Sequence, residues 1–276
     1  MKCKRIIHNS ISRHMGILPV LLVAAIALVL AVSVPAAWAE EFDEAEIFFE
    51  LNNTDGDLGI HALIDGEAWR YLKIEDPKKR QMLNIRVKGR LRQQGLTEIF
   101  FESAEPTFDE LDPEDFFNRF PEGEYTIKGK VLEGDKLESV AEITHVMPAP
   151  PEVYFMIDDN MFPAAEGCDA EDLPEFVVGE PVIIYWNPVA YSHPELGTSG
   201  VEIEVVNYEV VVEIDETPWK TSIILPPDAT SFQVPSEILD LVEFDDESEA
   251  EIKFEVLVRE VSFNQTAVES CFVIVE

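Results

Sequence analysis

Residues 46–64 read EIFFELNNTDGDLGIHALI, two short apolar runs on either side of a turn. From Glu46 to Asn52 apolar and polar residues largely alternate, which is typical of a half-buried β-strand. Asp55-Gly56 between two such runs indicates a β-hairpin, because these turn positions often need a positive φ. The stretch therefore predicts two paired strands, Glu46–Asn52 and Ile60–Ile64.

Similar patterns follow along the first half of the chain. Asp65-Gly66 predicts a second turn, leading into a strand over 68–74. Glu133-Gly134-Asp135 predicts a third, between strands over 125–132 and 136–143. We therefore expect this half to be built from short antiparallel strands.

One helix is expected to interrupt these strands. Asp112 is a good N-cap, Pro113 suits the first helical position and Pro121 ends the pattern. Phe116, Phe117 and Phe120 would share one face of this helix. We expect that face to cover one end of the first domain.

The proline-rich segment at 148–151 is the best domain boundary, because prolines fix φ and remove amide donors. We predict one domain over 40–147 and another over 152–276. The strands expected in the second domain are 181–186, 201–214, 222–225, 231–234, 251–261 and 268–275.

The second domain resembles a fibronectin type III domain. Residues 183–188 (IIYWNP) are similar to that family's second strand, whose Trp lies between the sheets, and 226–234 to its loop into the fifth strand. Residues 254–258 and 262–266 resemble its last hairpin, whereas Ile252 stands where the family usually has a tyrosine. The resemblance implies an all-β chain of two β-sandwich-like domains in tandem, the second fibronectin type III/Ig-like, and a binding or spacing role.

The N-terminus indicates export. Its basic leader holds four cations: Lys2, Lys4, Arg5 and Arg13. An apolar run over 17–34 and the small residues around Ala39 follow, which predicts a signal peptide at 1–39 cleaved before Glu40, with a retained anchor as the alternative. We expect a periplasmic or extracellular protein with no membrane span after cleavage. The first domain also resembles the N-terminal part of bacterial exported proteins.

The chain is strongly acidic, with 55 Asp and Glu against 20 Lys and Arg and a formal net charge of −35. Such a field repels nucleic acid and anionic membranes and attracts cations. A hydrophobic content of 46% with 17 Phe excludes a disordered chain. The acidity also has a simpler interpretation, which is that it keeps a β-rich protein in solution.

Two of the three cysteines, Cys168 and Cys271, lie outside the predicted leader. In an oxidising compartment an even pair predicts a disulfide, with two separate buried thiols as the alternative.

The turn at 52–59 is a candidate calcium site. Asn53, Asp55 and Asp57 offer oxygen ligands at every second position, as calcium loops do. Leu58 and Ile64 stand where an EF-hand needs Gly and an acid, so an EF-hand is excluded. The alternatives are a hairpin turn without metal and a calcium site completed by a distant carboxylate; we expect no other cofactor.

A basic stripe alternates with other residues over 85–92. Its cations are Arg86, Lys88, Arg90 and Arg92. A strand here would place all four on one face, where they would bind an anionic glycan or protein partner or the second domain, which has three cations against 29 acids. The alternatives are charged protection of a sheet edge and pairing with acids of neighbouring strands: Glu46, Glu50, Glu98 or Glu102.

No enzyme motif for a catalytic serine, zinc, phosphate loop or redox dithiol is present, and three histidines outside the leader hardly allow a metallohydrolase. His61 and His145 are interpreted as structural. We therefore predict a non-catalytic exported binding or scaffolding protein of the cell envelope or exterior. The alternatives are a calcium-stabilised adhesion module and, third, a hydrolase without a recognisable motif.

Overall fold

The computed structural model describes residues 39–157, 160–170, 173–214, 217–242, 244 and 249–276. The predicted signal peptide lies outside these residues, except for Ala39. Within the described segments, no helix has both the length and the apolar character needed to span a bilayer.

The first hairpin is confirmed: β1 (Glu44–Asn52) pairs antiparallel with β2 (Asp57–Glu75). Gly56 has a φ of +65° in the turn, a conformation that favours glycine. Along β1 the side chains of Ile47, Phe49 and Leu51 are buried in the first hydrophobic core.

The turn predicted at Asp65-Gly66 is wrong, because β2 continues through it for 19 residues. Up to Asp65 β2 pairs with β1 and β4, the β4 pairing extends to Trp69 opposite Leu96, and the later part of β2 pairs with β5 and β3. A side chain at Gly66 would meet the Phe42 ring, since an added Cβ would lie 3.2 Å from Phe42 Cδ1. The glycine therefore gives room for packing, and one strand serves two groups of neighbours.

The remaining strands of the first domain are β3 (Gln81–Arg86), β4 (Leu96–Glu102), β5 (Gly123–Val131) and β6 (Lys136–Ile143). A short helix, α2 (Leu91–Gln94), lies between β3 and β4. The hairpin predicted at 133–135 is present, because β5 and β6 pair antiparallel across it.

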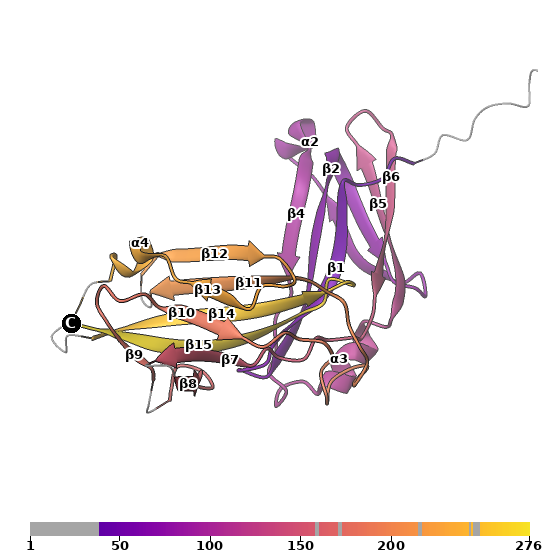
Figure 1. Ribbon diagram of the computed structural model, residues 1–276. Coiled ribbons are helices and arrows are strands. Elements are labelled where there is room, and N and C mark those ends of the chain that lie inside the picture. The colour runs from indigo at the N-terminus through magenta and orange to yellow at the C-terminus, as the bar shows by residue number, and fades with distance from the viewer. Residues whose placement is uncertain (1–38, 158–159, 171–172, 215–216, 243, 245–248) are drawn as a thin grey trace, which may run out of the picture. The chain divides into compact units, whose positions relative to one another are not determined.

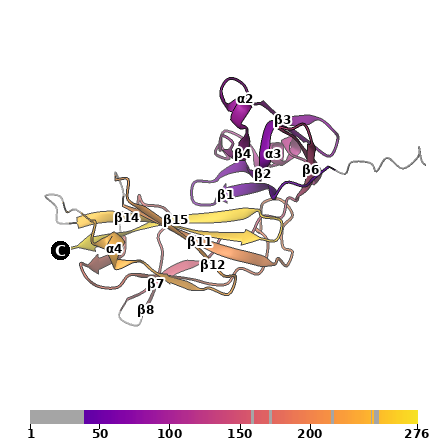
Figure 2. The same cartoon turned by 90° about the horizontal axis from the view of Figure 1, so that it is seen from above.

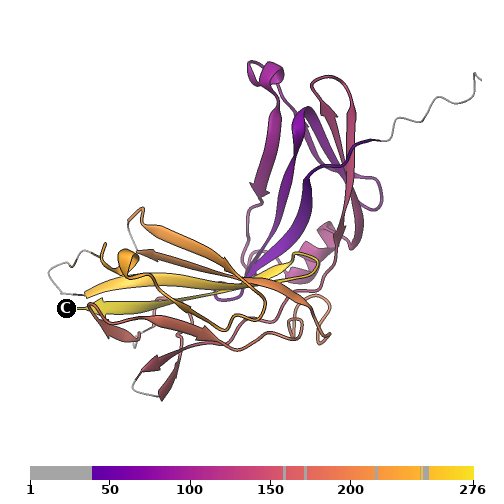
Figure 3. The same cartoon turned by 45° about the horizontal axis from the view of Figure 1, so that its top comes forward.

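The predicted helix is confirmed as α3 (Pro113–Arg119), close to the lower end of β1 in Figure 3. Asp112 Oδ1 accepts a hydrogen bond from the backbone N–H of Glu114 at 2.8 Å. The buried Phe116 and Phe117 rings both contact Phe49 edge-on, at centroid distances of 5.5 and 5.6 Å.

The chain after the proline-rich segment contributes to two sheets and holds a short helix, α4 (Ser236–Leu239) (Figure 1). One sheet has the order β13-β10-β7-β8 and the other contains β12-β11-β14-β15, with β9 also paired to β15. The strands are β7 (Val153–Ile157), β8 (Asn160–Pro163), β9 (Glu175–Val177), β10 (Ile183–Trp186), β11 (Val205–Ile214), β12 (Lys220–Leu225), β13 (Ser231–Gln233), β14 (Glu249–Glu260) and β15 (Gln265–Val275).

Side chains from both sheets share one core. The Phe155 ring of β7 contacts the Phe254 ring of β14 at 5.6 Å, and Trp186 of β10 is fully buried beside Tyr208 of β11. Figure 2 shows β14 and β15 side by side, as their antiparallel register requires. The all-β prediction, with a second domain of the fibronectin type III/Ig-like sandwich class, is confirmed.

One sheet contains strands from both sides of the proline-rich segment. β1 pairs in parallel with β15 from Glu50 opposite Gln265 to Asn52 opposite Ala267. Thr266 Oγ1 donates to the carbonyl of Pro148 in the proline-rich segment at 2.8 Å. Residues 40–276 form one compact unit, and the division at 148–151 stays a prediction.

Cys168 and Cys271 form a disulfide with a Cα–Cα distance of 4.9 Å and a sequence separation of 103. Next to it, Gly167 N–H donates to the carbonyl of Glu269 on β15 at 3.3 Å. The bond thus attaches the segment before β9 to β15.

Candidate functional site

The predicted strand face of four cations is wrong, because β3 ends at Arg86. Val87 is buried and its N–H donates to the carbonyl of Arg70 on β2 at 3.0 Å. Gly89 then has a φ of +62°, which turns the chain into α2. Arg90 and Arg92 consequently leave the sheet and do not alternate with Arg86 on a strand.

The structure instead collects three of these cations around a hollow of about 490 Å³, which we call the basic hollow. Its lining residues are Arg70, Tyr71, Arg86, Val87, Lys88, Arg92 and Lys130. Arg90 is not among them.

Tyr71 is at the centre of this arrangement. In the sheet it is the register partner of both Arg86 on β3 and Lys130 on β5. The Arg86 guanidinium lies over the Tyr71 ring, with Cζ 5.3 Å from the ring centroid, which is a cation–π contact. The four-cation stripe predicted from the sequence did not include Lys130, which joins this group through the register of β5 with Tyr71, or Arg70, which precedes Tyr71 on β2.

Among the described residues, the cations of the basic hollow have no acidic partner. In the part of the chain that the structure describes, none of the five has a carboxylate oxygen within 4.0 Å of its charged nitrogens. The next cations along the same strands differ, since Lys73 Nζ and Lys128 Nζ contact Glu75 at 2.6 and 3.3 Å. Glu75 thus gives Lys73 and Lys128 a shared counter-charge, whereas the cations of the hollow have no such contact among the described residues.

Two of the acids that we weighed as strand partners have other contacts. Glu46 Oε2 lies 3.3 Å from Arg259 Nη1, and Glu50 lies beside His61 and Gln265. The hollow is therefore not neutralised by Glu46 or Glu50.

The side chains of the predicted calcium turn have separate partners. His193 Nε2 lies 3.1 Å from Asn53 Oδ1, and Asp55 Oδ2 accepts a hydrogen bond from Asn52 at 3.0 Å. Asp57 is partly buried near Glu105, and burial followed by that charge raises the pKa of Asp57 to about 6. A calcium site formed by Asn53, Asp55 and Asp57 stays a prediction.

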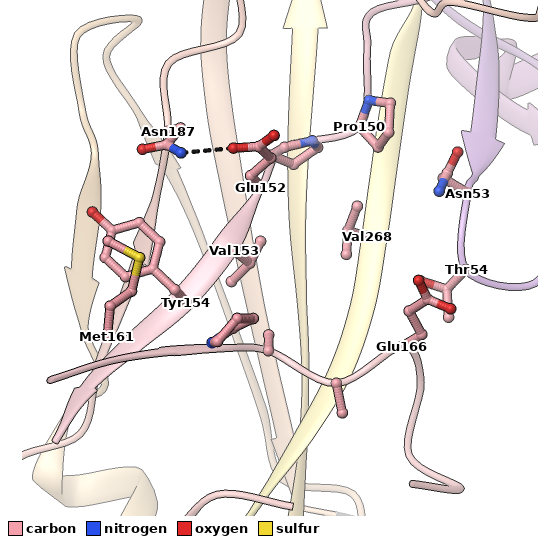
Figure 4. A pocket seen from close by; sticks show the side chains of 14 residues that line it. Asn53, Thr54, Pro150, Glu152, Val153, Tyr154, Met161, Glu166, Asn187 and Val268 are labelled. Atoms are coloured by element: carbon pink, nitrogen blue, oxygen red, sulfur yellow. Dashed lines mark hydrogen bonds between the residues drawn. The ribbon is translucent and has the colours of Figure 1, made fainter.

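A second hollow, of about 500 Å³, lies beside the proline-rich segment (Figure 4). Thr54, Glu152 and Glu166 contribute polar groups to it, and Asn187 donates a hydrogen bond to Glu152 at 2.8 Å. Its two carboxylates would repel an anion. The two hollows therefore differ in the charge of the ligand that they favour.

No protein-family model matches the sequence, and no curated protein is similar to it in sequence. Similar solved structures include the FN1–FN3 domains of chicken CNTN1, with 8% identity and a TM-score of 0.30, covering 85% of this chain and 69% of that chain. A two-domain fibronectin type III segment of chicken tenascin has 11% identity and a TM-score of 0.25, covering 84% and 99%. A cytokine receptor complex has 10% identity and a TM-score of 0.25, covering 83% and 94%. The fold class of the second domain rests on the strand order and core described above.

Proposed function

We propose that this protein is a non-catalytic binding protein that holds an anionic glycan of the cell envelope or exterior in the basic hollow. The observation that carries the proposal is the group of five cations that have no carboxylate partner among the described residues, although the chain has 55 acidic residues. Export, which the sequence of 1–39 predicts, supports a ligand at the cell surface.

The electrostatics of the hollow favour a bound anion. Like charges that line one hollow repel one another, so Arg70, Arg86 and Lys130 repel one another in the free protein. An anion bound between them would relieve this repulsion, as Glu75 does for Lys73 and Lys128.

The side-chain types favour sulfate, phosphate or carboxylate groups on the ligand. Arg70, Arg86 and Arg92 carry planar guanidinium groups, which bind such anions through two parallel hydrogen bonds. Lys88 and Lys130 add flexible point charges at the same hollow. Several cations in one place suit a polymer with repeated charges better than a single small anion.

The proposal is tested with dextran sulfate, using uncharged dextran of the same length as the control polymer. We expect the purified protein to bind dextran sulfate, to bind dextran at least tenfold more weakly, and to lose affinity as salt rises. The variant R86A/K130A should bind at least tenfold more weakly, since each charge-assisted contact contributes about 1.5 kcal/mol or more.

The matched control variant is K73A/K128A. It removes two cations from β2 and β5, and both of these cations already contact Glu75. It should bind dextran sulfate with an affinity within about twofold of the wild type, and the loss of two positive charges accounts for that difference. Equal losses in the two double variants would mean nonspecific attraction and would contradict the proposal. Binding to an acidic polypeptide such as polyglutamate, but not to dextran sulfate, would assign the hollow to a protein partner instead.

A further inference from the structure

His61 lies between two carboxylates on the face of the first sheet opposite its core. Its Nε2 is 2.8 Å from Glu105 Oε1, and its Nδ1 is 3.5 Å from Glu50 Oε2. The residue is 3% exposed, so this imidazole is almost fully buried. Buried imidazole together with carboxylates is a ligand set that proteins use for divalent transition metals.

The sheet brings these three residues together from distant parts of the sequence. Glu50 belongs to β1, His61 to β2, and Glu105 to the segment that follows β4. One ligand atom from each lies within 4.8 Å of the other two, and small side-chain movements would bring all three to a common ion. At metal–ligand distances of about 2.0–2.2 Å, an ion would replace the present contacts of His61.

Gly59 makes room for the Glu105 carboxylate. A Cβ added at Gly59 would lie 2.3 Å from Glu105 Oε1, which is too close for any side chain. A residue other than glycine would therefore displace this oxygen from His61. Glycine at position 59 therefore allows the Glu105 carboxylate to reach His61.

The groups around the three ligands also hold them in position. The His61 ring lies between the rings of Phe48 and Phe100, at centroid distances of 5.4 and 5.9 Å. Gln265 of β15 donates a hydrogen bond from Nε2 to Glu50 Oε2. Partners of this kind orient ligands in metal sites and raise their affinity.

The charge of the cluster calls for a cation. Glu50, Glu105, Asp57 and Glu102 are close enough to influence His61 or one another electrostatically. The nearby Arg259 forms its ion pair with Glu46, outside this group. Even a protonated imidazole would leave the carboxylates in excess, whereas a divalent ion would neutralise twice as much charge.

We propose that Glu50, His61 and Glu105 bind a divalent transition-metal ion of the Zn²⁺ class. The imidazole favours such ions over Ca²⁺ and Mg²⁺, which prefer oxygen ligands. Three protein ligands leave one position of a tetrahedral ion for water or for the neighbouring Asp57. The bound ion would tie β1, β2 and the segment after β4 together, and the proposal does not depend on the basic hollow.

The test is a calorimetric titration of Zn²⁺ into the metal-free protein. We expect one ion per chain, little effect of millimolar Ca²⁺ or Mg²⁺, and a higher unfolding temperature with Zn²⁺. Both H61Q and E105Q should weaken Zn²⁺ binding at least tenfold, and G59A should weaken it as well. The control E98Q removes a carboxylate from β4 without touching the three ligands, and it should bind as the wild type does.

Absence of Zn²⁺ binding by the wild type would overturn the proposal. Wild-type affinity in both H61Q and E105Q would also overturn it, because the ion would then lie elsewhere on the acidic surface. Circular dichroism shows whether each variant is folded. If H61Q does not fold, the result for E105Q decides, since the side chain of Glu105 is 27% exposed and tolerates an isosteric change.

Discussion

Asn264 Oδ1 accepts a hydrogen bond from the backbone N–H of Phe49 at 2.8 Å, across 215 positions of sequence. The same side chain donates through Nδ2 to the carbonyls of Thr144 and Val146, both at 3.0 Å. Asn264 is 1% exposed, so these groups are satisfied by one another and not by bulk water. A single amide therefore fixes the β14–β15 hairpin to β1 and to the segment after β6.

Replacing Asn264 by Ala should lower the free energy of unfolding by about 3 kcal/mol. The variant leaves the Phe49 N–H and the two carbonyls without their partner, and each buried unsatisfied group costs about 1–3 kcal/mol. Denaturant unfolding measures the change. The control is Asn84→Ala, which removes an exposed amide, and it should change stability by less than about 0.5 kcal/mol. Equal stability of the two variants would show that the Asn264 contacts contribute nothing.

Removing the disulfide should also lower stability. The Cys168–Cys271 bond closes a loop of about 100 residues, for which the chain-entropy model gives about 4–5 kcal/mol. We expect the variant C168S/C271S to unfold at lower denaturant concentration than the oxidised wild type. Chemically reduced wild type should behave like the variant. A midpoint unaffected by reduction would contradict this assignment.

Stability should rise on mild acidification, in part because of Glu260. This residue is 3% exposed, and burial raises the pKa of its carboxyl above the usual value of 4.5. The folded state therefore holds the proton more tightly than the unfolded state does. Its contribution to stability is fully present below pH 4.5 and is lost as the pH rises through the raised pKa.

The measurement is the free energy of unfolding of wild type and Glu260→Gln between pH 8 and pH 5. Gln keeps an oxygen that can accept from Ser262, which donates to Glu260 in the wild type. We expect the variant to be more stable than the wild type at pH 8 and to show a smaller gain toward pH 5. Glu124→Gln, at an exposed position of β5, is the control and should keep the wild-type slope. If the free energy of unfolding of Glu260→Gln changes with pH as the wild type's does, Glu260 does not contribute to the pH dependence.

Local signals in the sequence were enough for much of the fold. Asp55-Gly56 and Asp112-Pro113 act within a few residues, so the first hairpin and α3 were predictable. Asp65-Gly66 carries the same dipeptide as Asp55-Gly56 but lies within a continuous strand. The difference is that Asp65 is paired on both sides, with Glu44 of β1 and Glu98 of β4, and no local pattern reveals this pairing.

The candidate sites also depend on contacts between residues that are far apart in the sequence. The charges at Arg86 and Lys88 were identified from the sequence, whereas Lys130 reaches the same hollow from β5 through its register with Tyr71, and Arg70 lines it from β2. The alternation over 85–92 does not form a strand, because β3 ends at Arg86 and Gly89 has a positive φ. His61 gained its carboxylate neighbours from β1 and from the segment after β4, which spacing along the chain does not show.

The central claim is that the basic hollow binds a polyanion, and its most direct test is a map of amide chemical shifts during titration with dextran sulfate. The account predicts the largest changes at Tyr71, Arg86, Lys88 and Lys130, with none of that size on adding uncharged dextran. Changes at Lys73 and Lys128 should be smaller, because both already contact the Glu75 carboxylate. Shifts concentrated elsewhere, or equal shifts with both polymers, would contradict the claim.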